Sequence, residues 1–236
     1  MCYGITLKKV KEKFSMTISK LQTFGILYII RQKSGGMKMD MMKNIGNTPM
    51  IKITYKYKGK INFIYTKLEY YNLTGSIKDR VAYYIIKKAK ETGTLKEGMP
   101  IIEATSGNTG ISLSALGAYF GHPVYIFMPD WVSKERVKIM ESYNAHVTLV
   151  SREQGGFKRC INEAKKLAKI KNGFLANQFS NTDNILAHYE TTGQEIINTL
   201  TEDVYGFVSR SWYRWNFNGY RAKTKKSKQR FISNCN

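Results

Sequence analysis

The feature that most constrains the fold is a regular alternation of short apolar runs with helical patterns between residues 37 and 203. Three of the predicted strands begin near residues 101, 124 and 147, an even spacing. Strand, helix and strand at such an interval are typical of crossovers between parallel strands. The alternation therefore predicts an α/β fold with a wound parallel sheet rather than a solenoid repeat. The predicted strands are Ile61–Ile64, Pro100–Glu103, Val124–Met128, His146–Val150 and Gly173–Ala176. The predicted helices are Lys78–Glu91, Thr109–Phe120, Ser133–Tyr143, Gly156–Ala168 and Leu186–Leu200.

Two polar turns open helices in this region. The first, at 72–80, places Lys78 at a helix start, after the turn-forming residues Asn72 and Gly75. The second, at 104–110, follows the strand that ends near Glu103. Ligands of open parallel sheets bind at the carboxyl ends of strands, against helix N-termini. The second turn is therefore a candidate anion site, although a capped helix start would use the same residue types.

The net charge is unusual, because 38 Lys and Arg residues face 17 Asp and Glu residues and give +21. Such an excess ordinarily suggests nucleic acid or an anionic membrane as a partner. Here most of the excess lies in residues 1–36 and 204–236, and the central region is only mildly basic. A nucleic-acid footprint should be patterned on the folded part. We therefore expect neither nucleic acid nor a membrane as a partner.

Cysteines and histidines give no metal or disulfide pattern. Cys2, Cys160 and Cys235 are scattered and odd in number, which favours a cytoplasmic location and no metal site. The three histidines, at 122, 146 and 188, are interpreted as loop or surface residues. The apolar run 23–30 is too short to span a bilayer.

Five segments in a fixed order change the interpretation of the two turns. Together they resemble cysteine synthase (O-acetylserine sulfhydrylase), of the β-family (fold type II) of pyridoxal-phosphate enzymes, which also includes cystathionine β-synthase. The resemblance covers roughly residues 41–208 and implies a two-lobed parallel-sheet fold like that of the tryptophan synthase β chain. The segments are Asn44–Met50, Gly75–Arg80, Thr105–Gly110, Asn177–Phe179 and His188–Gly193.

The resemblance implies a role for each site residue. Lys78 is similar to the lysine that holds the cofactor, pyridoxal 5'-phosphate, through its aldehyde and later moves the substrate α-proton. Asn108 is similar to the residue that hydrogen-bonds the phenolic oxygen of the cofactor. A carboxylate requires convergent donors, and a lysine that condenses with an aldehyde must spend time unprotonated. The remaining residues implied at the site form the cradle for the substrate α-carboxylate: Thr105, Ser106, Gly107, Thr109 and Gln178.

The implied activity is a transferase reaction, β-replacement, in which O-acetyl-L-serine and sulfide give L-cysteine and acetate. The implied partners are therefore an amino acid and sulfide, with a homodimer expected for the intact family. Two alternatives stay open. One is a cystathionine β-synthase-like enzyme that uses homocysteine. The other is a non-catalytic protein whose basic ends bind a partner.

The two ends depart from the family pattern. A Gly/Thr-rich loop for the cofactor phosphate should follow Val208, but the chain continues with Trp212 and Trp215. Because TGG read one base later always encodes glycine, a frameshift near codon 209 would hide such a loop. We therefore expect residues 209–236 to be an aberrant basic tail, and residues 1–36 to be an extension outside the fold. Such a truncated chain has doubtful activity.

This pattern predicts a division into two lobes. Residues 80–183 form the smaller α/β domain, and residues 41–79 and 184–208 form part of the large domain, so that the second lobe is incomplete. An incomplete lobe leaves apolar faces and strand edges uncovered.

Overall fold

The computed structural model describes residues 40–200, 206–208 and 230–231. The predicted extension 1–36 and the tail from 209 lie outside the described residues, apart from Arg230 and Phe231. The described residues from Met41 onward belong to one compact unit.

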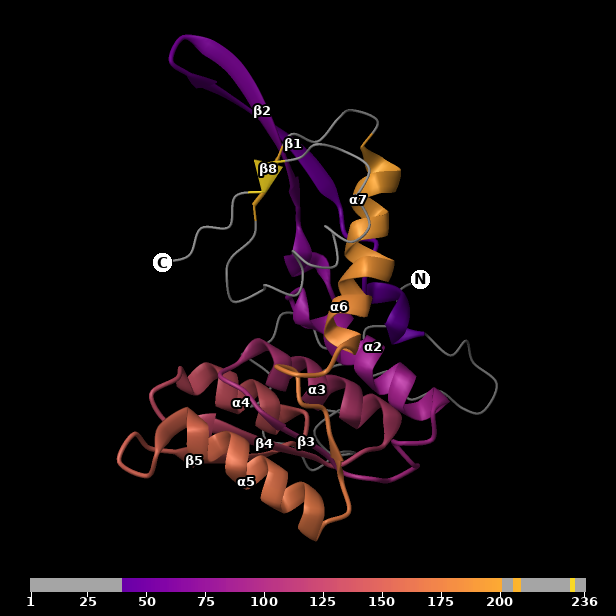
Figure 1. The fold of residues 1–236 in the computed structure, drawn as a ribbon, viewed down its shortest axis with the longest axis vertical. Helices are drawn as coiled ribbons and strands as arrows, with labels where there is room; N and C mark the ends of the chain where they lie inside the picture. The colour runs from indigo at the N-terminus through magenta and orange to yellow at the C-terminus, as the bar shows by residue number, and fades with distance from the viewer. Residues whose placement is uncertain (1–39, 201–205, 209–229, 232–236) are drawn as a thin grey trace, which may run out of the picture. The chain divides into compact units, whose positions relative to one another are not determined.

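A four-stranded parallel sheet in the order β5-β4-β3-β6 forms the centre of the fold. The helices between these strands make the crossovers that the sequence predicts, so the α/β prediction is confirmed (Figure 1). The strands are β3 (Ile101–Ala104), β4 (Val124–Pro129), β5 (His146–Val150) and β6 (Phe174–Leu175). The crossover helices are α3 (Asn108–Phe120), α4 (Lys134–Ser142) and α5 (Gly156–Ile170), and α2 (Lys78–Glu91) precedes β3.

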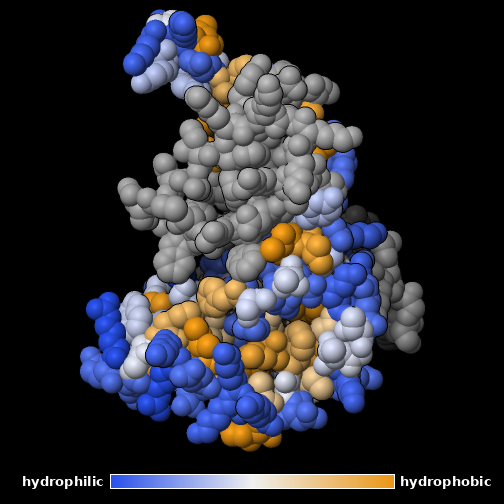
Figure 2. All heavy atoms as spheres, in the orientation of Figure 1, coloured by the Kyte–Doolittle hydropathy of each residue, from blue (hydrophilic) through white to orange (hydrophobic). Residues whose placement is uncertain are grey.

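Alternate side chains of the central strands enter two apolar layers, one on each face of the sheet. Ile101 and Ile126 pack with α2, α3 and α4 on one face. Ile102 and Phe127 pack with α5 on the other face. Because both faces are covered there, β3 and β4 are mostly apolar rather than alternating with polar residues. The outer face of α5 carries lysines, and hydrophilic side chains predominate over this part of the molecule (Figure 2).

A hairpin precedes the sheet. Strands β1 (Met50–Tyr57) and β2 (Lys60–Lys67) pair antiparallel, with Tyr57 opposite Lys60. Lys58 and Gly59, between them, have φ angles of 47° and 77°. Positive φ at both positions of a two-residue loop defines the hairpin turn whose twist matches that of the strands. Only the second strand of this hairpin is among the strands predicted from the sequence.

The segment after the sheet is helical but not one regular helix. α6 (Asp183–Ala187) continues through a π-helical turn, η4 (His188–Thr192), into α7 (Gly193–Thr199). The remaining short elements are η2 (Met41–Asn44), η3 (Glu69–Tyr71), β7 (Gly206–Phe207) and β8 (Arg230–Phe231). No helix in the described ranges is long and apolar enough to cross a membrane.

Arg80 connects the hairpin base with α7. Its guanidinium donates to Glu69 at 2.7 Å and to Glu195 at 2.6 Å, and its side chain is fully buried. Lys67, at the end of β2, donates to the same Glu195 carboxylate at 2.6 Å. Burial alone would raise the pKa of Glu195, but the hydrogen bonds from Arg80 and Lys67 lower this pKa to about 2. The cluster is thus an ionised network between segments far apart in the sequence.

Candidate active site

A cavity of about 430 Å³ lies at the carboxyl end of β3, where the sheet topology places ligands. The structure brings all of the site residues predicted from the sequence to this cavity. They are Lys78, Thr105, Ser106, Gly107, Asn108, Thr109 and Gln178.

Lys78 is the first residue of α2 and is 7% exposed. Its backbone N–H donates to Ser76 Oγ at 3.2 Å. The preceding turn is held by Asp79, whose carboxylate accepts from the Thr74 N–H at 2.6 Å and from the Thr74 hydroxyl. Burial lowers the pKa of Lys78 to about 8. A substantial fraction of the amine is therefore neutral near physiological pH, as a nucleophilic lysine requires.

The loop between β3 and α3 provides hydrogen-bond donors. Thr105 extends the ladder, because its N–H donates to the Phe127 carbonyl at 3.0 Å. Its hydroxyl oxygen accepts from the Gly107 N–H at 3.2 Å. α3 begins at Asn108, so the N–H groups of its first turn have no acceptor within the helix. Hydroxyls, an amide and these N–H groups form a donor set that suits an anion.

Gln178 closes the cavity from the loop after β6. Its side-chain Oε1 accepts from the Thr109 hydroxyl at 2.5 Å, and its Nε2 donates to the Ala104 carbonyl at 3.3 Å. It follows Asn177, which has a φ of 52°, a left-handed conformation that asparagine tolerates. The two loops are thus joined directly across the cavity.

The structure adds cavity residues that the sequence analysis did not identify. Asn184 is 1% exposed, and its Nδ2 donates to the Gln178 carbonyl at 3.0 Å. Arg136 donates to the Ser106 carbonyl at 3.1 Å. Neither belongs to a motif with a recognisable spacing, so no local pattern could have indicated them. The other added lining residues are Pro129, Trp131, Phe157 and Phe179.

The interpretation of His188 as a loop or surface residue is wrong. This side chain is 1% exposed within η4, and its Nδ1 lies 3.1 Å from Thr192 Oγ1. Burial lowers the pKa of His188 far below its usual value, and the charges of Lys78 and Arg80 lower it further. His188 is therefore neutral at physiological pH, and its imidazole adds no positive charge near Lys78. The sequence could not show this burial, because the register of the π-helical turn determines it.

The donor set fits part of pyridoxal phosphate. A buried amine of lowered pKa suits the aldehyde, and the polar loop suits the phenolic oxygen and a substrate carboxylate. The segment after Val208, where the family pattern places a phosphate loop and this sequence departs from it, lies outside the described residues. Among the described residues no group of three or more His, Cys, Asp or Glu could hold a metal ion.

Comparison with known proteins identifies the class. Residues 41–210 match the family model described as pyridoxal-phosphate dependent enzyme. The chain therefore belongs to this family, whose cofactor is pyridoxal phosphate, and the family prediction is confirmed.

Named relatives narrow the similarity. A probable cysteine synthase of Bacillus subtilis (strain 168) is 41% identical over 159 residues, which are 67% of this chain and 51% of the relative. A hydrogen sulfide-producing enzyme from Fusobacterium nucleatum is 46% identical, with a TM-score of 0.75 over 79% of this chain and 57% of that structure. Cystathionine beta-synthase of Rattus norvegicus is 33% identical over 203 residues, 84% of this chain and 36% of the relative. The chain spans about half the length of the cysteine synthases it matches.

Close packing beneath the loop leads to a first prediction. A Cβ atom added at Gly110 would lie 2.8 Å from Thr105 Cγ2 and 2.9 Å from Met140 Sδ. We expect Gly110→Ala to lower the free energy of unfolding by about 1–3 kcal/mol, as overpacking does, measured by urea denaturation. Thr105→Ser removes the Cγ2 methyl group with which the added Cβ atom would clash. The double variant should therefore lose less than the sum of the two single variants, and strict additivity would contradict the predicted contact.

Proposed function

We propose that this chain carries the lysine-bearing part of a pyridoxal-phosphate enzyme that makes L-cysteine from O-acetyl-L-serine and sulfide by β-replacement. The observation that carries the proposal is the position of Lys78. Its buried amine, of lowered pKa, shares one cavity with the Thr105–Thr109 loop and Gln178. Family membership and the cysteine synthase relatives support the same conclusion.

Each residue has a proposed role. Lys78 Nζ binds the aldehyde of the cofactor and later removes the proton from the substrate α-carbon. Asn108 holds the phenolic oxygen of the cofactor. The substrate carboxylate is bound by the Thr105–Thr109 loop, with Gln178 closing it from the opposite side. Pyridoxal phosphate, when bound, supplies the electron sink at the α-carbon. In the net reaction the bond from the β-carbon to acetate breaks, and a bond from that carbon to sulfur forms.

The domain division is proposed in the form the sequence predicts, with residues 80–183 as the smaller domain and 41–79 with 184–208 as part of the large one. The ion-pair network supports this division, because it joins the two large-domain segments. Lys67 of the first segment pairs with Glu195 of the second, and Lys67 also lies near Glu69 of its own segment. Arg80 joins both at the domain boundary. A cytoplasmic location and a homodimer are proposed on the family resemblance.

The proposal is tested by mixing the chain with pyridoxal phosphate and recording absorbance at the edge of the visible range. Borohydride reduction followed by peptide mass spectrometry should locate the label on Lys78. O-acetyl-L-serine is then added with sulfide or, in a parallel sample, with homocysteine, and the products are identified. Cystathionine as the main product would favour the homocysteine-using alternative. A chain that forms no such absorbance, yet binds nucleic acid in a salt-sensitive manner, would favour the non-catalytic alternative.

A pH dependence of this condensation follows from the lowered pKa of Lys78, which is about 8. Only the neutral amine attacks an aldehyde, and its fraction falls about tenfold for each pH unit below the pKa. We expect the initial rate of absorbance change to rise with pH, to reach half its maximum near pH 8 and to level off above that pH, measured by stopped-flow spectroscopy. If the rate instead keeps rising until the pH reaches the pKa of an ordinary lysine, the reacting amine is a solvent-exposed one.

A further inference from the structure

One buried carboxyl group, that of Glu103, connects the two loops that build the cavity. Glu103 lies in β3 and is 2% exposed. Its Oε1 accepts a hydrogen bond from the Ala104 N–H at 2.8 Å, and its Oε2 accepts one from the Gln178 N–H at 2.9 Å. A single carboxylate thus spans from the residue before Thr105 to the loop after β6.

Gln178 depends on this link more than on its other contacts. Its carbonyl accepts from Asn184, its Oε1 accepts from Thr109, and its Nε2 donates at 3.3 Å to a carbonyl. These partners are neutral, whereas Glu103 can be ionised. A hydrogen bond to an ionised acceptor is about twice as strong as one between neutral groups. The position of the Gln178 side chain, and with it that of the Thr109 hydroxyl, therefore depends on the charge of Glu103.

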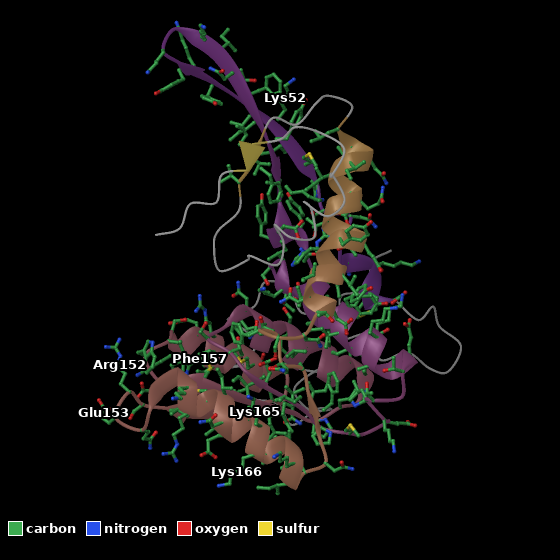
Figure 3. The ribbon with its side chains drawn as sticks, viewed as in Figure 1. Lys52, Arg152, Glu153, Phe157, Lys165 and Lys166 are labelled. Atoms are coloured by element: carbon green, nitrogen blue, oxygen red, sulfur yellow. The ribbon has the colours of Figure 1, made fainter. Side chains whose placement is uncertain are left out.

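The surroundings of Glu103 make this charge adjustable. Burial raises the pKa of Glu103 to about 7, although the N–H groups of Gln178 and Ala104 lower it in part. The Glu103 side chain alternates with that of Ile102 along β3 and lies opposite Ile126 of β4. It therefore enters the layer of α2, α3 and α4, whose titratable members are Tyr83 and Tyr84 of α2. A smaller cavity of about 180 Å³ on the α5 side has Glu103 and Lys165 in its lining, and Figure 3 shows Lys165 projecting from α5.

We propose that Glu103 is a positioning residue that holds the Thr105–Thr109 loop and Gln178 in register for a substrate carboxylate. This inference rests on the function proposed above. The ionised carboxylate offers an acceptor oxygen to each N–H. On protonation one oxygen becomes a hydroxyl, which is a poor acceptor, and the link to one loop weakens. The two loops are therefore firmly joined above neutral pH and loosened below it.

Hydrogen exchange on the chain without cofactor tests the link directly. Glu103→Gln keeps the shape of the side chain but removes the charge and one acceptor. We expect exchange of the amides in 176–180 to accelerate about fivefold or more, measured by mass spectrometry. Glu163→Gln is the matched control, because Glu163 lies on α5 and pairs only with the exposed Arg159 among the ion pairs described. Unchanged exchange in the Glu103 variant would overturn the proposal.

A second measurement follows the consequence for ligand binding. In the cofactor-loaded chain, O-acetyl-L-serine should bind about tenfold more weakly to Glu103→Gln, measured by spectral titration. The pH profile of binding should lose its step near pH 7. A profile that keeps this step would contradict the role of Glu103, because replacing a merely structural residue would not remove it.

The two proposals can fail separately. If the chain forms no absorbance with pyridoxal phosphate, the proposed function fails, while exchange still decides the role of Glu103. If Glu103→Gln does not fold, the unsubstituted chain is measured instead. Protection of 176–180, corrected for the intrinsic pH dependence of exchange, should increase as the pH rises through about 7. Constant protection would overturn the link.

Discussion

Replacing Lys78 by alanine is expected to abolish the absorbance that forms with pyridoxal phosphate, and with it all β-replacement. The buried amine is the nucleophile proposed to bind the aldehyde, and no other described residue that lines the cavity carries an amine. Loss of the attacking group removes the covalent step rather than slowing it. Absorbance spectra before and after borohydride reduction measure the effect.

Lys87→Ala is the matched control for this prediction. Lys87 lies on the same helix, but its side chain is 55% exposed and pairs with Glu91 at 3.8 Å. Its removal should leave the absorbance unchanged. Lys78→Arg is a second control, because it keeps a positive charge in the cavity without a condensable amine. Normal absorbance in either Lys78 variant would show that another lysine binds the cofactor.

Replacing Arg80 by methionine is expected to lower the free energy of unfolding by about 3–5 kcal/mol, the cost of leaving a buried ion without its partner. The Arg80 side chain is fully buried, and the carboxylates of Glu69 and Glu195 would face each other without it. Urea denaturation followed by circular dichroism measures the loss. Arg80 pairs with Glu69 at the hairpin base and with Glu195 in α7. Its replacement should therefore destabilise both segments.

A control variant, Arg159→Met, and measurements of stability at several pH values test the contribution of the Arg80 network further. Arg159→Met removes an exposed pair with Glu163 and should cost less than about 1 kcal/mol. The carboxyl of Glu195 has a pKa of about 2 in the folded chain, against 4.5 in the unfolded one. The folded state therefore binds fewer protons, and this stabilisation is present above pH 4.5 and is lost as the pH falls toward 2. An Arg80→Met chain as stable as the parent would show that the network contributes nothing net.

Much of the sheet and its helices could be predicted from the sequence, because burial on both faces leaves a strong local pattern. The predicted helix 78–91 agrees with α2, and the predicted strand 124–128 agrees with β4 except that β4 extends to Pro129. The segment predicted as one helix over 186–200 differs, since it contains the π-helical turn of η4. π-helical turns are rare and are usually a single turn inside an α-helix, so they interrupt a helical pattern without a recognisable signal of their own.

The first strand of the hairpin was missed although its local pattern was available. Ile51, Ile53, Tyr55 and Tyr57 alternate with polar residues, which is the two-residue period of a strand. The Lys58–Gly59 turn was a second local indication.

The candidate site also contains residues that the sequence indicates and residues that only the structure reveals. Residues in short motifs, from Thr105 to Thr109 and Lys78, could be placed from their order alone. Glu103 and Asn184 act through partners 75 and 6 positions away along the chain, so only the folded structure relates them to Gln178.

The π-helical turn at His188–Thr192 lets one continuous segment contribute to two different sites. Such a turn accommodates one residue more than an α-helix of equal length, which turns everything beyond it by about 100°. Before the turn, Asn184 contacts Gln178 beside the cavity; after it, Glu195 contacts Arg80 in the ion-pair network. Deleting a single residue within the turn would therefore separate Glu195 from Arg80 while leaving Asn184 in place. The length of this short segment, more than its composition, keeps the hydrogen bond of Asn184 to Gln178 and the ion pair of Glu195 with Arg80 in phase.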